Sequence, residues 1–396
     1  MRSKYLVLIG DGMADLPLKA LGGKTPLEVA RTPNMDYLAQ HGTVGWTNNI
    51  PPKMPPGSDV AAMSIFGYDP KKYYSGRGPL EAASLGIKLR KGKLAFRCNL
   101  VTVKNGKMQD FTAGHISTAE ADKIIKVLNA KLGNKDIHFY TGVSYRHLTV
   151  IRSMVHGQLP MVKTTPPHDI TGQRIHDYLP KGKGSEFVLR LMNEGEVVLH
   201  DLKSKANMIW LWGQGTAPSM PSFKKKFGKT GAIITAVNLL KGIGKIIGLE
   251  VINVPGATGY LDTNYPGKAN AALKALKRHD VVFVHVESPD EAGHEGNIKH
   301  KIKAIEDFDR LIVGKVLQGI EGSRHRGIKV LVLPDHPTPI KYMTHTADAV
   351  PFIVWGKGHM RAHEGIEGYN EKEARKAKWV VEQGSKLLNL FFAEEK

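Results

Sequence analysis

The sequence predicts an α/β protein built on a mostly parallel sheet that helices cover on both faces. Short apolar runs alternate with helical segments along most of the chain, and residues 5–9, 281–286 and 330–333 are apolar runs that lead into acidic residues. Buried parallel strands read as continuous apolar runs, and open α/β sheets bind ligands at the carboxyl ends of their strands. We therefore expect the functional site at that edge of the sheet.

The elements follow in order along the chain. Residues 5–10 read as the first strand, and Pro33 starts a helix to Gln40 that stops before Gly42, the arrangement that proline and glycine favour at helix ends. Residues 60–66 read as a helix, which puts Ser58 near a helix N-terminus. The pattern further predicts helices at 186–193, 236–241 and 266–279, and strands at 94–103, 208–212, 231–235, 249–254, 281–286 and 328–333.

The pattern changes between residues 105 and 180. A helix at 118–132 precedes strands at 136–141 and 145–152, and a proline-rich loop covers 164–170. A helix beside antiparallel-looking strands indicates a small α+β insertion. We expect a core formed by 1–104 and 181–396, and an inserted cap or substrate domain at 105–180 that moves as a lid.

The composition is that of a globular protein with a strongly basic balance. The chain has 56 Lys and Arg against 37 Asp and Glu, a formal net charge of +19. The cations are spread, and the densest run, 224–226, is short, which favours a solvated surface that attracts anionic substrates over a nucleic-acid site. The single Cys98, the lack of a basic and apolar leader before the first strand, and the lack of a membrane-length apolar stretch predict a cytoplasmic protein without a membrane role.

Seven side chains predict a two-metal site for phosphoryl transfer. Acidic residues and histidines follow three predicted strands, and these residue types suit Mn²⁺ or Zn²⁺. Two such ions can hold both the attacking and the leaving oxygen of a displacement at phosphorus. Each residue alone also fits a helix cap, a solvated pair or a turn, but their conjunction favours the metal site. The set is Asp11, Ser58, Asp290, His294, Asp335, His336 and His345.

Two nucleotide-binding motifs are incomplete. Gly10-Asp11-Gly12 follows a strand, but the dinucleotide pattern requires Gly or Ala where Asp15 stands. The Gly-Lys-Thr triplets at 23–25 and 228–230 lack the earlier glycine of a P-loop. Hydride transfer and nucleotide binding are therefore not predicted.

The motifs resemble those of cofactor-independent phosphoglycerate mutases of the archaeal type, within the alkaline phosphatase superfamily of metalloenzymes. The segments that carry the resemblance span nearly the whole chain: 9–13, 26–28, 32–36, 56–59, 67–70, 76–81, 289–294 and 334–336. The resemblance implies an alkaline-phosphatase-like core with an inserted cap, two metal ions, and the glycolytic interconversion of 3- and 2-phosphoglycerate through a phosphoserine intermediate. By position, Ser58 would be the nucleophile and a metal ligand. Asp11, Asp335 and His336 would join it around one ion, and Asp290, His294 and His345 would hold the other.

One position departs from this pattern. Pro337 follows His336, where archaeal-type mutases usually have Ser or Thr. In this the chain resembles bacterial relatives for which a homoserine kinase role has been proposed. The alternative function is therefore a phosphotransferase or phosphatase that acts on homoserine or another small phospho-acid.

Several cationic or polar residues are candidates to bind the substrate. Arginine suits forked binding of phosphate and carboxylate, although each arginine also fits a surface charge. The candidates are Arg77, Arg97, His115, Arg146, His147, His168 and Asp169. Lys241 is the candidate catalytic lysine, and a lysine that faces a helix C-terminus is its alternative interpretation.

Overall fold

The computed structural model describes residues 3–152, 162–321, 327–356 and 365–393. Contacts between residues divide the chain into two compact units. We call Met1–Tyr74 with Met220–Lys396 the core unit, and Ser75–Ser219 the insert unit.

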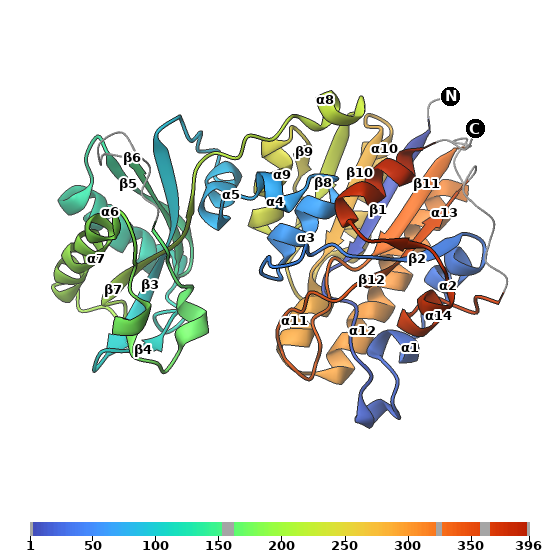
Figure 1. Ribbon diagram of the computed structural model, residues 1–396, viewed down its shortest axis with the longest axis horizontal. Coiled ribbons are helices and arrows are strands. Elements are labelled where there is room, and N and C mark those ends of the chain that lie inside the picture. Colours follow the sequence, from blue (N-terminus) through green and yellow to red (C-terminus); the bar gives the residue numbers. More distant parts are fainter. Residues whose placement is uncertain (1–2, 153–161, 322–326, 357–364, 394–396) are drawn as a thin grey trace. The chain divides into compact units, whose positions relative to one another are not determined.

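The core unit is built on an eight-stranded sheet with the strand order β13-β2-β12-β11-β1-β10-β8-β9 (Figure 1). The five strands from β11 to β9 are parallel to one another, whereas β12 pairs antiparallel with both β11 and β2. This architecture confirms the predicted α/β fold with a mostly parallel sheet. The strands are β1 (Lys4–Gly10), β2 (Thr43–Thr47), β8 (Gly231–Ile234), β9 (Glu250–Ile252), β10 (Val281–Val286), β11 (Ile328–Leu333), β12 (Val350–Trp355) and β13 (Val380–Val381).

Helices cover both faces of this sheet because successive strand residues point to opposite sides. Leu6 and Leu8 of β1 pack in one buried cluster with residues of α2, α10 and α12. Tyr5, on the other face, contacts the ring of Phe391 in α15. The helices of the core unit are α1 (Pro26–Val29), α2 (Pro33–Gln40), α3 (Ser58–Ile65), α4 (Pro70–Tyr73), α8 (Phe223–Phe227), α9 (Asn238–Ile246), α10 (Tyr265–Leu276), α11 (Ser288–His294), α12 (Ile298–Phe308), α13 (Gly314–Glu321), α14 (Glu371–Lys376) and α15 (Leu387–Phe392).

The insert unit contains a five-stranded antiparallel sheet in which β3 pairs with β4, β6 and β7, and β5 pairs with β6. Helices α6 and α7 pack their apolar faces on it, and Leu128 of α6, Leu191 of α7 and Phe96 of β3 belong to one buried cluster. The strands are β3 (Lys93–Lys104), β4 (Lys107–Asp110), β5 (Ile137–Val143), β6 (Arg146–Arg152) and β7 (Met208–Gly215), and the helices are α5 (Arg77–Ser84), α6 (Thr118–Leu132) and α7 (Ser185–His200).

The insert unit is larger than the segment 105–180 that the sequence pattern suggested. Strands β3 and β7, which we expected in the core sheet, pair with each other in the insert unit. Residue 105 lies in the tight turn between β3 and β4, inside this unit. An apolar run predicts a strand, but it does not name the strand that it pairs with, and this pairing assigns β3 and β7 to the insert unit.

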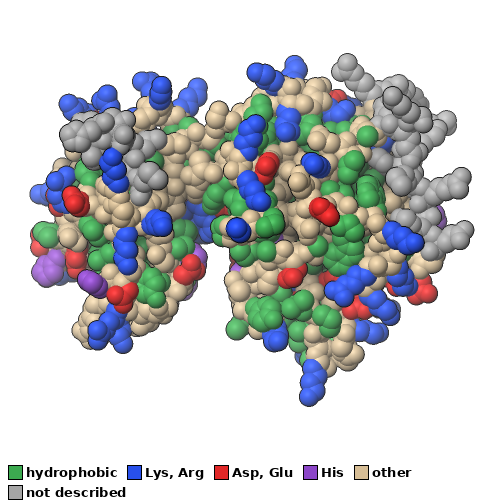
Figure 2. All heavy atoms as spheres, in the orientation of Figure 1, with side chains coloured by type: hydrophobic (Ala, Val, Ile, Leu, Met, Phe, Trp, Pro, Cys, Tyr) green, Lys and Arg blue, Asp and Glu red, His purple; other side chains and the backbone are tan. Residues whose placement is uncertain are grey.

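Lysine and arginine side chains are spread over both units on the face that Figure 2 shows, rather than gathered in one patch. Among the described residues, no helix combines the length and the apolar character that a bilayer crossing requires.

Candidate metal centre

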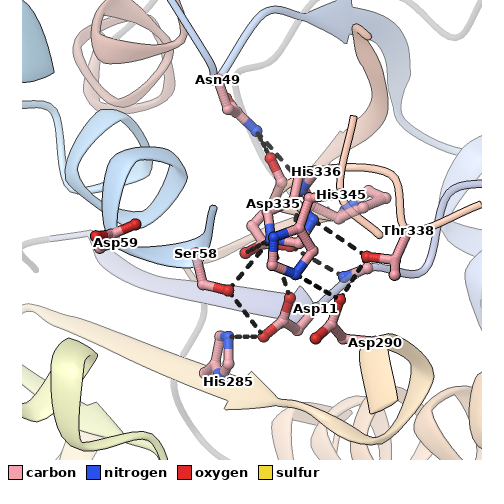
Figure 3. Close-up of polar contacts among 12 residues, drawn as sticks. Asp11, Asn49, Ser58, Asp59, His285, Asp290, Asp335, His336, Thr338 and His345 are labelled. Atoms are coloured by element: carbon pink, nitrogen blue, oxygen red, sulfur yellow. Dashed lines mark hydrogen bonds and ion pairs between the residues drawn. The ribbon is translucent and has the colours of Figure 1, made fainter. Parts of the chain in front are cut away.

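The predicted metal ligands of the core unit meet at the carboxyl edge of its sheet (Figure 3). Asp11 follows β1, Asp290 lies in α11 just after β10, and Asp335 and His336 follow β11. Because β11, β1 and β10 are adjacent parallel strands, their ends bring these side chains together. His345 joins them from the loop that leads to β12.

The first group of potential ligands consists of Asp11, Asp335 and His336, whose ligand atoms lie within 4.8 Å of one another. His336 Nε2 is 3.6 Å from Asp11 Oδ1 and 3.4 Å from Asp335 Oδ2. Both of these carboxylate oxygens are buried and have no hydrogen-bond partner among the described residues. Buried carboxylate oxygens that point at one imidazole nitrogen without donors of their own are suited to a shared cation.

The second group consists of Asp290, His336 and His345. His294 adjoins it, because its Nε2 is 3.3 Å from Asp290 Oδ2 and 2.9 Å from His345 Nε2. His294 Nδ1 lies 3.0 Å from the carbonyl oxygen of Met343, which can only accept a hydrogen bond. Nδ1 therefore carries the hydrogen, and in a neutral ring Nε2 presents its lone pair to the site.

The electrostatics of the site also favour cations. Burial, together with the charges of Asp335 and Asp290, raises the pKa of Asp11 well above its usual range. Burial acts in the same direction on Asp290, but without a cation His294 and His345 can donate hydrogen bonds to its carboxylate, and these outweigh burial and hold the pKa of Asp290 well below its usual range. A cation bound by Asp290 and the two rings would take the place of these hydrogens. Three acidic groups in one buried space repel each other when ionised. Their donor set of carboxylates and imidazoles fits two divalent cations.

The side chain of Ser58 lies close to the potential metal ligands. Ser58 is the first residue of α3, and its Oγ is 3.2 Å from His336 Nε2 and 3.5 Å from Asp11 Oδ2. The backbone N–H groups at a helix N-terminus favour a negatively charged oxygen or phosphate. This is a position in which a serine oxygen can attack an anion that cations hold.

Because Gly12 has no side chain, Asp290 and Thr338 can lie close to its backbone. Its φ of +60° is in the left-handed region, and a Cβ there would lie 2.5 Å from Thr338 Oγ1 and 2.6 Å from Asp290 Oδ1. Its backbone N–H donates a hydrogen bond of 3.0 Å to Asp335 Oδ1.

Three residues near the ligands were missed by sequence reasoning: Asn49, His285 and Thr338 (Figure 3). Asn49 Nδ2 donates to the carbonyl of Asp335 at 3.0 Å. Thr338 donates a short hydrogen bond to Asp290 Oδ1. The closeness of Thr338 to His336 in the sequence was an available signal, whereas nothing local marked Asn49.

His285 is a histidine inside an otherwise apolar buried strand, β10, and that anomaly could have identified it. Its Nε2 lies 3.1 Å from Asp11 Oδ2, and its Nδ1 lies 3.3 Å from Thr235 Oγ1. Burial lowers the pKa of His285 to about 4, so the ring is neutral at physiological pH.

Lys241 lies half-buried in α9, which packs against α3, the helix that begins with Ser58. Burial and the neighbouring charge of Lys245 lower the pKa of Lys241. Lys268 of α10 is fully buried and donates to the carbonyl of His285 at 3.2 Å, and burial lowers its pKa to about 8. The sequence did not single out this second lysine.

Three of the candidate substrate residues surround the indole of Trp212 in the insert unit. A fourth, Arg146, lies over the ring of Tyr145 at 5.4 Å. The guanidinium of Arg97 lies 4.4 Å from the ring centre of Trp212, and that of Arg77 lies 5.8 Å from it. The ring of His168 is 5.4 Å from the same indole. Burial lowers the pKa of Arg97, against the opposing effect of Glu81, and the charges of Arg77 and Arg146 lower it further.

The other candidates in this unit differ in exposure. His147 is 2% exposed, its Nδ1 accepts a hydrogen bond from the backbone N–H of Gly142, and burial lowers its pKa to about 4. A neutral, buried ring that already accepts a backbone hydrogen bond is poorly suited to bind an anionic substrate directly. His115 is exposed and has a positive φ of 53°. Asp169 is also exposed, and its Oδ1 lies 3.4 Å from His168 Nε2.

Comparison with known proteins gives one consistent family. Residues 39–204 match the sequence profile of the 2,3-bisphosphoglycerate-independent phosphoglycerate mutases. A protein of Methanosarcina acetivorans with that name is 51% identical over 98% of this chain and 99% of its own. A probable enzyme of that name from Geobacter sulfurreducens is 50% identical with the same coverage.

Solved structures agree with these relatives. A protein of Pyrococcus horikoshii is 30% identical with a TM-score of 0.81 and covers 100% of this chain and 99% of its own. The cofactor-independent phosphoglycerate mutase of Thermoplasma acidophilum is 26% identical with a TM-score of 0.67 and covers 99% of each chain.

Proposed function

The chain belongs to the 2,3-bisphosphoglycerate-independent phosphoglycerate mutase family, and we propose that it interconverts 3- and 2-phosphoglycerate through a phosphoserine on Ser58. The observation that carries this proposal is the position of Ser58. Its Oγ is 3.2 Å from Nε2 of His336, the residue that belongs to both groups of potential metal ligands.

In the first half-reaction, Ser58 Oγ attacks the phosphorus of 3-phosphoglycerate and the bond from phosphorus to the C3 oxygen breaks. The proton of the serine is transferred to that leaving oxygen, so that glycerate and phosphoserine result. In the second half-reaction, the C2 hydroxyl of the bound glycerate attacks the phosphoserine. The serine oxygen leaves and recovers a proton, and 2-phosphoglycerate is formed.

We propose that the predicted ligands hold two divalent cations. Asp11, Ser58, Asp335 and His336 would hold one, and Asp290, His294 and His345 would hold the other, which the two groups of potential ligands support. Carboxylate and imidazole ligands suit Mn²⁺ and Zn²⁺. When bound, such ions neutralise the negative charge of the transferred phosphoryl group.

The cationic residues of the insert unit that the sequence singled out remain our proposed phosphoglycerate ligands. The mutual closeness of Arg77, Arg97 and His168 around Trp212 supports this role, because these groups are held by ring contacts rather than free to move in solvent. Retention of glycerate between the half-reactions also requires that water be excluded, since water would hydrolyse the phosphoserine.

The test is a mutase assay with the metal-loaded protein. Addition of 3-phosphoglycerate should yield 2-phosphoglycerate, and the reverse, without added 2,3-bisphosphoglycerate. No interconversion with either Mn²⁺ or Zn²⁺ would refute the proposal. An assay with homoserine and ATP serves as the control for the alternative substrate class and should show no phosphohomoserine.

A further inference from the structure

The hydroxyl of Thr338 contacts ligands from both metal groups. Thr338 is fully buried, and its Oγ1 donates to Asp290 Oδ1 and lies 3.3 Å from His336 Nδ1 (Figure 3). Asp290 belongs to one group of potential ligands, and His336 belongs to both. A single side chain that is not itself in either group therefore bridges the two.

The directions of these two hydrogen bonds follow from the donor inventory of the three groups. An ionised carboxylate can only accept, so the one hydrogen of the Thr338 hydroxyl points to Asp290. The hydroxyl oxygen then faces His336 Nδ1 with a lone pair, and this contact is satisfied only when Nδ1 carries the ring hydrogen. In a neutral ring this leaves the lone pair on Nε2.

Nε2 of His336 is the atom that faces the rest of the site. It lies 3.2 Å from Ser58 Oγ and 3.4 Å from Asp335 Oδ2. A lone pair at this position can bind a cation, whereas a hydrogen there would exclude one.

The backbone carbonyl and N–H of Thr338 both form hydrogen bonds. Its carbonyl accepts a hydrogen bond of 2.7 Å from the buried ammonium of Lys301, and its N–H donates to the carbonyl of Ala14 at 3.3 Å. The backbone that carries the hydroxyl is thus held in place by contacts that do not involve the ligands.

We propose that Thr338 is a positioning residue for both metal sites: its hydroxyl orients the Asp290 carboxylate and selects the His336 tautomer that offers Nε2 to a cation. This inference rests on the proposed two-metal site. It also gives a function to the segment after Pro337, where the sequence departs from the archaeal pattern.

The test compares Mn²⁺ binding to the apo protein by calorimetry in wild type, Thr338→Val and Thr338→Ser. Valine keeps the shape and removes the hydroxyl, so we expect Mn²⁺ affinity to fall about 10–100-fold. Serine keeps the hydroxyl and should stay within about 3-fold of wild type, since the contact that governs ligand orientation is retained. Thr149→Val is the matched control, because Thr149 is a fully buried threonine of β6 in the insert unit.

Wild-type protein that binds no divalent cation would refute the proposed metal site. Wild-type binding that Thr338→Val leaves unchanged would refute the positioning role alone. If Thr338→Val does not fold, ¹⁵N NMR of the wild-type apo protein with labelled histidine gives the answer, with His336→Gln assigning the signal. A hydrogen on Nδ1 of His336 supports the inference, and a hydrogen on Nε2 of a neutral ring overturns it.

Discussion

The ammonium of Lys301 lies 2.7 Å from Asp15 Oδ2, and neither side chain is exposed to solvent. The same ammonium donates to the carbonyls of Ala14 and Thr338, so three acceptors surround its three hydrogens. Asp15 in turn accepts a hydrogen bond from the backbone N–H of Ile340. This buried pair therefore ties the loop after β1 to the loop after β11, the two loops that carry Asp11 and Asp335.

Lys301→Met should lower the free energy of unfolding by about 3–5 kcal/mol, because it leaves the Asp15 carboxylate buried without its counter-charge. Urea unfolding of the chelator-treated protein measures this. Lys303→Met is the matched control, since Lys303 is 59% exposed and its partner Asp307 keeps Arg310. Equal stability of the two variants would contradict the structural role of the buried pair.

Stability should fall as the pH rises, in part through Glu371. Burial, opposed by hydrogen bonds from Thr25 and the Asp15 amide, raises the pKa of Glu371 to about 7. A carboxyl group with a raised folded-state pKa favours folding most below its unfolded-state pKa, and this contribution is lost as pH rises through about 7. Between about pH 4.5 and 7.5 the free energy of unfolding should therefore fall less in Glu371→Gln than in wild type, by up to about 3 kcal/mol.

Unfolding measured across this pH range checks the prediction. Glu196→Gln, at an exposed position of α7, controls for the loss of one charge. A pH dependence that Glu371→Gln shares with wild type would show that another group causes it.

Ser58→Ala should reduce mutase turnover by at least about 10³-fold, because it removes the proposed nucleophile while it changes little packing. Ser64→Ala is the matched control, since Ser64 lies in the same helix, is buried, and has an Oγ without a hydrogen-bond partner among the described residues. Thermal unfolding should be similar for both variants. Near-normal turnover of Ser58→Ala would remove Ser58 from the mechanism.

Arg146→Ala should lower kcat/KM for phosphoglycerate by about 10–100-fold, the effect of a lost charged hydrogen bond to an anion. Mn²⁺ affinity should not change, because Arg146 belongs to the insert unit and the ligands belong to the core unit. Arg190→Ala, an exposed arginine of the same unit, is the control. Loss of Mn²⁺ binding in Arg146→Ala, or unchanged kinetics, would contradict a substrate-binding role.

Much of the fold and of the candidate site was predictable because it depends on local pattern. Apolar runs that end in Asp11, Asp290 and Asp335 identify buried parallel strands and their carboxyl ends. The carboxyl ends of parallel strands lie at one edge of a sheet, so the sequence predicted a site at that edge. The adjacency of β11, β1 and β10 is what brings the three carboxylates together. The family could likewise be recognised from short motifs, and the comparisons confirm it.

Other features were decided only by the tertiary structure. The pairing of β3 with β7 assigns both strands to the insert unit, and no local signal distinguishes them from core strands. His285 and Asn49 reach the site by packing from β10 and from the loop after β2, and the burial of His147 follows from its place in β6. The bridge that Thr338 makes between Asp290 and His336 exists because chain folding brings residues 290 and 338 together. Hydrophobic periodicity specifies which face of an element is buried, but it does not specify the partner, and hydrogen bonds between distant residues depend on the partner.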